Sequence, residues 1–263
     1  MPPKKRYPNE SKTSYGKRIT RPSYNDLAPF VIFLDPNTFF FGNTKLQPSI
    51  GDNLKLNYSI DKTLFSIDYN VESDAIARYQ PIVLESGQQV FTSINLDYRN
   101  TFSFLISQRY KMNKWWDGSI NLLGVNRNMK TKEDKEIKSN YVRINGSQSF
   151  KLPKEITFEI SGIFQTPSKN GVAELGNYGN MTLGLQRKFS DNSKLGLTLD
   201  NIFGFDYNVY TADDLNANYF TNTNYSYEPR IFKLTYTYNF GNNKMKNTRN
   251  RSTGSEDIKS RLN

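Results

Sequence analysis

The dominant feature of this sequence is an alternation of apolar and polar residues with a period of two. In the segment 226–240, apolar side chains occupy every second position from Phe232 to Phe240, and Lys233 begins the polar set between them. Successive side chains of a β-strand point to opposite faces, so such a segment forms a strand with one apolar and one hydrophilic face. The pattern recurs along the chain and no segment has a convincing helical period. The sequence therefore predicts an all-β fold.

The alternating segments predict about ten strands that are joined by short and long connections in turn. The expected strands are 11–20, 51–60, 63–84, 88–111, 114–127, 138–151, 154–166, 176–189, 192–203 and 226–240. Tight turns are expected near 61–62, 112–114, 153–154 and 191–192, and longer loops near 21–50, 85–88, 128–137, 167–176 and 204–226. An antiparallel meander with short turns at one end and long loops at the other is typical of outer-membrane barrels. The segments 63–84 and 88–111 are about twice the ~9–11 residues that cross a bilayer, so we expect them to project beyond it.

Alternation alone does not separate a membrane barrel from a soluble β-sandwich. In a sandwich the apolar faces of two sheets meet, whereas in a barrel they contact lipid. Trp115 and Trp116 follow a short turn, and Tyr238 and Phe240 lie at the end of the last expected strand. Aromatic residues favour the membrane interface, although ordinary β-propensity enriches the same residues. The pattern favours a membrane barrel over a sandwich.

Composition excludes several classes of protein. The chain has no Cys and no His, which excludes disulfides, thiol nucleophiles and Ser-His-Asp catalysis. Its mean hydropathy is −0.70 and no apolar run approaches the ~18 residues of a membrane-spanning helix. The first six residues contain no apolar segment of the kind found in a signal peptide.

The net charge of +10 resides at the two ends of the chain. Residues 1–21 contain seven bases and one acid, and residues 241–263 contain six bases and two acids. The segment 22–240 therefore has 22 bases and 22 acids and is neutral. A basic groove on the folded body is not supported, and we do not expect nucleic acid as a partner.

The polar residues form no catalytic or metal-binding pattern. Asp68 and Glu72 share one strand face but lie ~13 Å apart, too far for an acid–base pair, and Asp213 and Asp214 lack the spacing of an EF-hand. We predict no catalytic residue, metal ligand or cofactor, and no enzymatic activity. The segment 204–226 is rich in Asn and Tyr, which suit sugar or peptide surfaces, although an ordinary external loop fits equally well. Its candidate ligand-binding residues are Tyr207, Tyr210, Asp213, Asp214, Tyr219 and Tyr225.

Two stretches resemble the C-terminal part of the barrel in the TonB-dependent outer-membrane receptor-like family. The first stretch contributes Arg18, Arg21, Pro22, Ser23, Tyr24, Pro29, Phe30, Gly42, Asn43, Leu46 and Pro48. Ala28 and Thr44 stand where we expect Asn and Pro in the family. The second stretch is the closing strand with Tyr236, Tyr238 and Phe240, which is similar to the signal that barrel-assembly machinery reads, here followed by 23 further residues.

The resemblance implies a receptor with a plug domain inside a barrel of about 22 strands, which imports a glycan, siderophore or peptide with force transmitted by TonB. We accordingly expect a leader at 1–10, a transmembrane barrel segment at 11–240 and a basic flexible tail at 241–263, with no plug domain. The expected fold is an antiparallel up-and-down β-barrel segment, partial or open. The expected function is that of a C-terminal receptor fragment in the outer membrane of a Gram-negative bacterium, not competent for transport alone.

The expected partners are outer-membrane lipid and the barrel-assembly machinery, with TonB engaged only through N-terminal regions missing here. One alternative is a self-contained small barrel with a structural or passive-pore role. Another is a soluble β-rich module whose basic ends bind nucleic acid.

Overall fold

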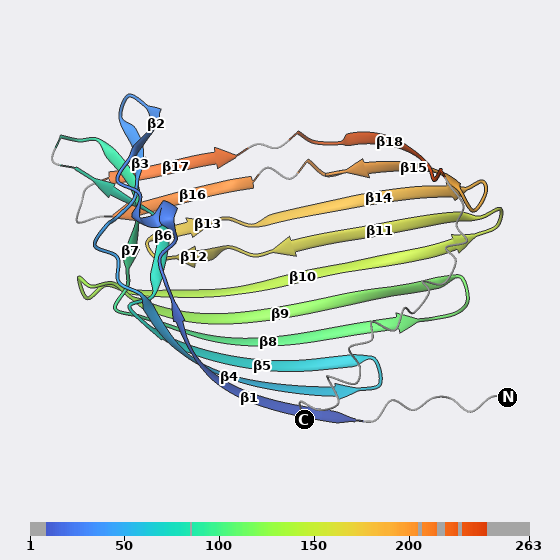
Figure 1. Ribbon diagram of the computed structural model, residues 1–263, viewed down its shortest axis with the longest axis horizontal. Helices are drawn as coiled ribbons and strands as arrows, with labels where there is room; N and C mark the ends of the chain where they lie inside the picture. Colours follow the sequence, from blue (N-terminus) through green and yellow to red (C-terminus); the bar gives the residue numbers. More distant parts are fainter. Residues whose placement is uncertain (1–8, 85, 205–206, 215–218, 226–227, 241–263) are drawn as a thin grey trace, which may run out of the picture.

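Ten strands form one curved antiparallel sheet, the main sheet (Figure 1). The computed structural model describes residues 9–84, 86–204, 207–214, 219–225 and 228–240; most of the expected leader and the whole expected tail lie outside them. The strands of the main sheet are, in order, β1 (Glu10–Thr20), β4 (Ser49–Ile60), β5 (Thr63–Ser73), β8 (Tyr98–Lys111), β9 (Trp116–Lys130), β10 (Glu136–Leu152), β11 (Ile156–Gln165), β14 (Tyr178–Lys188), β15 (Ser193–Asp200) and β18 (Ile231–Tyr238). Within the described ranges, β1 and β18 are the two edges and do not pair with each other. The predicted ten-stranded open barrel segment is confirmed.

Short turns connect the strands at one end of the main sheet, the turn end, and long connections join them at the other, the loop end (Figure 1). The turn between β8 and β9 is held by Asn113, whose Oδ1 accepts hydrogen bonds from the backbone N–H groups of Trp115 and Trp116 at 3.0 and 2.8 Å. An Asn side chain that bonds the backbone two residues ahead favours such turns. The short turns lie where the sequence predicts them.

The long connections are not irregular loops but build two small sheets at the loop end. One has the order β2 (Val31–Asp35), β3 (Thr38–Phe41), β7 (Gln89–Asn95), β6 (Ile76–Val83). The other contains β12 (Ser168–Asn170), β13 (Ala173–Leu175), β16 (Tyr207–Asp214) and β17 (Tyr219–Tyr225). The helix α1 (Tyr24–Leu27) has four residues, and no helix in the described part of the chain is long and apolar enough to cross a membrane. The prediction of loops at 21–50, 167–176 and 204–226 was therefore wrong, because short strands form there by pairing with distant segments.

The two longest predicted strands are each broken. The segment 63–84 divides into β5 and β6 at Asp74, whose φ of 51° turns the chain, and 88–111 divides into β7 and β8 at Leu96 and Asp97. The breaks are paired, because the Leu96 N–H donates to the Ala75 carbonyl at 2.8 Å. Ala75 and Leu96 are fully buried, and both belong to the core cluster of the loop end: Ala75, Ala77, Leu96, Met129 and Ile137. The two segments were predicted to continue as straight strands, but they turn and bury these apolar side chains in a local core.

The main sheet exposes its apolar face. On β4, Leu54 and Leu56 are 50% and 42% exposed, whereas the alternate residues Lys55 and Asn57 are partly buried. This distribution is the reverse of that in a water-soluble protein, and it is stable only where the apolar face contacts lipid. Because no second layer within the described ranges covers the apolar face of β4, the sandwich alternative is wrong.

Candidate functional site

The family motif includes the residues that start α1. Ser23 is the N-cap: its Oγ accepts from the Asp26 backbone N–H at 3.2 Å, and the Asp26 carboxylate accepts from the Ser23 backbone N–H at 2.9 Å. This reciprocal arrangement is a capping box, which satisfies backbone donors that a helix otherwise leaves open. Tyr24, the next motif residue, is 95% exposed and has no role in packing. The motif thus places one carboxylate, that of Asp26, at a fixed position.

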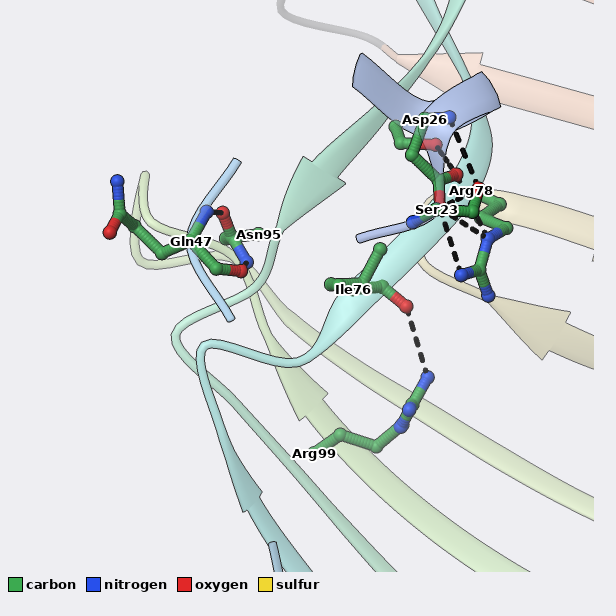
Figure 2. A network of polar contacts seen from close by, with 8 residues as sticks. Ser23, Asp26, Gln47, Ile76, Arg78, Asn95 and Arg99 are labelled. Atoms are coloured by element: carbon green, nitrogen blue, oxygen red, sulfur yellow. Dashed lines mark hydrogen bonds and ion pairs between the residues drawn. The ribbon is translucent and has the colours of Figure 1, made fainter. Parts of the chain in front are cut away.

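Asp26 is the centre of a polar network that joins three elements of the loop end (Figure 2). Its carboxylate accepts from Arg78 on β6 at 2.9 Å through both Nε and Nη2, and from the Ser93 hydroxyl on β7 at 2.9 Å. Asp26 is only 6% exposed. Burial by itself raises the pKa of this carboxyl, but hydrogen bonds from Arg78, Ser23 and Ser93 outweigh it and hold the pKa well below its usual range. Asp26 is therefore ionised and fully paired.

Gly42 and Asn43 close the same network from the other end of the motif. The Gly42 N–H donates to the Ala28 carbonyl at 3.0 Å, and a Cβ at Gly42 would lie 2.5 Å from the Ala28 backbone N and O. The Asn43 side chain donates to the Ser93 carbonyl at 3.0 Å. Further along, Gln47 and Asn95 exchange two hydrogen bonds of 2.8 and 2.9 Å (Figure 2). The motif residues thus fold the chain against β6 and β7.

The remaining motif residues are placed as follows. Arg21 and Pro22 lie between β1 and α1, Pro29 and Phe30 follow α1, Leu46 is buried at 7% exposure, and Pro48 precedes β4.

An aromatic cavity of about 320 Å³ lies beside the Asp26 network. The ring of Phe40 on β3 stacks on that of Phe91 on β7 with centroids 5.2 Å apart, and meets the ring of Tyr79 on β6 edge-on at 5.6 Å. Phe40 and Phe91 are direct neighbours because β3 and β7 pair in parallel, unlike the antiparallel pairs of the main sheet. The other lining residues are Asn25, Asp26, Ala28, Phe30, Ile32, Phe41, Gly42, Arg78, Thr92 and Ser93. An apolar cavity with a few polar groups is typical of a small-molecule site.

Tyr79 owes its position to an irregularity in β6. The pairing of β6 with β7 shifts register between Ala77 and Gln80, and Tyr79 adopts a left-handed φ of 58°. Gln80 is almost fully buried: its amide donates to the Asn170 carbonyl and accepts from the Val172 N–H, both at 2.9 Å. Tyr79, by contrast, is 59% exposed. A bulky residue with positive φ is strained, and such strain is concentrated at functional sites.

A second cavity of about 670 Å³ runs along the polar face of the main sheet. Arg99 and Glu72 form an ion pair there, with Nε and Oε2 2.7 Å apart, and Asn53 donates to Asp68 at 3.0 Å. The motif residue Arg18 lines the same cavity from β1. Glu72 is therefore paired with a base rather than with Asp68, and this face has the character of a hydrated barrel lumen.

Sequence reasoning missed Arg78, Tyr79 and the Phe40–Phe91 pair. Their neighbours are distant in the sequence, and only the unusual density of Phe in 30–41 could have pointed to a site.

The predicted ligand-binding residues lie on the β16–β17 hairpin at the loop end. The two strands pair with Asp213 opposite Phe220 and Asp214 opposite Tyr219, with a register shift between Asn208 and Tyr210, but the side chains of the candidate residues are outside the described residues. Their role stays a prediction. Tyr236 and Tyr238 lie on the edge strand β18, where Tyr238 pairs with Ser193 beside a short turn, and the rings of Tyr238 and Phe240 are 4.6 Å apart.

A family model described as "Outer membrane protein beta-barrel family" matches residues 4–238. The chain belongs to this family. It is a β-barrel protein of the outer membrane of a Gram-negative bacterium, as predicted. No curated protein matches it.

Solved receptor and transporter structures share the fold. The copper transporter OprC superposes with a TM-score of 0.57 at 16% identity, over 89% of this chain and 37% of its own length. An enterobactin-bound variant of the ferric enterobactin receptor PfeA from Pseudomonas aeruginosa superposes with a TM-score of 0.57 at 15% identity. The superposition covers 89% of this chain and 38% of the receptor. The siderophore receptor PirA from the same organism superposes with a TM-score of 0.51 at 13% identity. The superposition covers 74% of this chain and 36% of the receptor. This family member thus spans just over a third of the length of each of these structures.

Proposed function

We propose that this chain forms the C-terminal strands of the barrel of a TonB-dependent outer-membrane receptor for a large ligand such as a glycan, siderophore or peptide. The observation that carries the proposal is the superposition on receptor barrels over 89% of this chain but 38% of theirs. The main sheet is curved and open (Figure 1), and its edges β1 and β18 carry backbone groups that lipid cannot satisfy. In the proposed receptor, other strands would pair with these edges and complete the barrel.

The role proposed for the chain is that of a binding and scaffolding component without enzymatic activity. The loop end presents the aromatic cavity and the β16–β17 hairpin, with the candidate ligand contacts Tyr207, Tyr210, Asp213, Asp214, Tyr219 and Tyr225. The turn end carries Tyr236, Tyr238 and Phe240, which we propose as the strand read by the barrel-assembly machinery. TonB would act through a region that precedes this segment in the complete receptor, and residues 1–10 and 241–263 would be a leader and a basic tail.

The experiment that tests the proposal is an uptake assay in a cell whose only receptor is this chain. Without a plug and the remaining strands, we expect no energy-dependent uptake above the empty-vector background. Uptake that an uncoupler abolishes would refute the claim that the chain is incompetent alone.

A self-contained small barrel is the second candidate, because ten is an even number of strands and closure is allowed on that ground. It predicts heat-modifiable migration in gels and stable ion conductance in planar bilayers. Under the first proposal, neither is expected from the chain by itself.

A further inference from the structure

The aromatic cavity at the loop end has features that packing alone does not require. Two of its aromatic residues stay open to solvent, Phe30 at 57% and Tyr79 at 59% exposure, whereas Phe91 is 8% exposed. Tyr79 also keeps a left-handed backbone that a glycine would adopt without strain. An exposed aromatic side chain held in a strained position indicates a surface built for contact.

One polar group of the cavity retains unused hydrogen-bonding capacity. Asp26 engages Nε and Nη2 of Arg78, and no hydrogen bond joins Nη1 to any residue that the structure describes. The side chain of Arg78 remains 43% exposed. Thr92 pairs with Gln80, and its side chain alternates along β7 with those of Phe91 and Ser93, so its buried hydroxyl lies on the opposite face of the strand. The free donor of Arg78 is therefore the polar group available to a ligand.

We propose that this cavity binds a small aromatic acid, or an aromatic ring with an oxyanion on a larger ligand. The ring would lie against Phe40, Phe91 and the edge of Tyr79, because aromatic rings prefer stacked and edge-on contacts. The oxyanion would accept from Nη1 of Arg78, which matches the planar geometry of a carboxylate. The volume of about 320 Å³ is at the lower end of ligand sites, so it admits one substituted ring rather than a whole glycan.

The proposal rests on the receptor role proposed above, but its test measures binding and does not need transport. The probe is benzoate, followed by saturation-transfer NMR on the full chain in detergent micelles. Cyclohexanecarboxylate tests the need for an aromatic ring, and benzyl alcohol tests the need for the negative charge. Empty micelles give the background for partition into detergent. We expect benzoate to bind at least tenfold more tightly than either analogue.

Two variants separate ligand contact from folding. Tyr79→Gly removes the ring and relieves the left-handed backbone, so benzoate affinity should fall at least tenfold while the thermal midpoint stays equal or rises. Thr92→Val removes a buried hydroxyl on the face of β7 opposite to Phe91 with little change of shape, so benzoate affinity should stay within about twofold of that of the unaltered chain. Phe33→Ala is the matched control: Phe33 lies on β2, is 72% exposed and does not line the cavity.

Equal benzoate affinity in Tyr79→Gly and the unaltered chain would overturn the proposal, as would equal affinity for benzoate and its two analogues. Absence of any benzoate signal above empty micelles would overturn it too. None of these binding results tests uptake by the complete receptor, so the receptor role is tested separately by the uptake assay.

Discussion

Asp26→Asn should open the part of the loop end that contains α1, β2 and β3 without unfolding the main sheet. The carboxylate of Asp26 accepts from Arg78, Ser23 and Ser93. An asparagine retains one acceptor oxygen and presents an NH₂ group in place of the other. In the place of Oδ2, that NH₂ group would face Arg78 Nη2 and the Ser23 backbone N–H, which now donate to Oδ2 at 2.9 Å each; the Ser23 hydroxyl, which donates to Oδ2 at 2.7 Å, can turn to accept from it.

The expected cost follows from these two lost contacts. A hydrogen bond to a charged group contributes roughly 1.5–3 kcal/mol, and the partial exposure of Arg78 selects the low end of that range. Two such bonds amount to about 3 kcal/mol, or a roughly hundredfold increase in local opening. Hydrogen exchange with mass spectrometry, on the protein in detergent micelles, measures this opening peptide by peptide.

Peptides that cover 20–48 should exchange about a hundredfold faster in the variant, and peptides within β9 and β10 should not change. The matched control is Asp52→Asn, which removes an exposed carboxylate that accepts from Tyr15 at 2.5 Å and lies 3.7 Å from Lys17. Exposed pairs contribute little, so it should change exchange by less than about fivefold. Unchanged exchange at 20–48, or an equal increase across the main sheet, would refute the assignment of Asp26 as a local anchor.

Three further outcomes are expected. The pKa of Asp26 is depressed in the folded state relative to about 3.9 in the unfolded state, so the stabilisation by this carboxylate is present above about pH 4 and is lost as the pH falls further. Below about pH 4, the hydrogen-exchange rate of peptides in 20–48, corrected for intrinsic rates, should therefore rise in the unaltered chain and not in Asp26→Asn. Gly42→Ala should destabilise the same segment by roughly 1–3 kcal/mol, because the new Cβ collides with the Ala28 backbone; an unchanged exchange rate would show that this contact relaxes freely. Since the chain has no Cys, a single introduced cysteine reports the accessibility of its own position. In liposomes, Phe104→Cys on the apolar face should resist a water-soluble maleimide, and Ser103→Cys on the polar face should react with it. The opposite order of reactivity would invert the assignment of the lipid and lumen faces.

The sequence by itself determined the strands of the main sheet and the two faces of each. Alternation with a period of two is a local property, so the apolar set on β4 and its polar complement are visible without knowledge of which strands pair. The family motif contains Ser23, but the helix α1 and its capping box were not predicted, since the segment 21–50 was expected to be a loop. The same motif also indicated a receptor of the outer membrane.

Only the tertiary structure decided where the strands break and what the loop end contains. Asp26 and Arg78 are 52 residues apart, and Gln80 bonds to Asn170 across 90 residues. Pairing at such separations depends on which distant segments meet, and a local pattern does not specify that. The register shift that exposes Tyr79, and the parallel pairing that stacks Phe40 on Phe91, arise only from those contacts. Local alternation was therefore enough to predict the strands of the barrel wall, whereas the cavity at the loop end could be identified only from the tertiary structure.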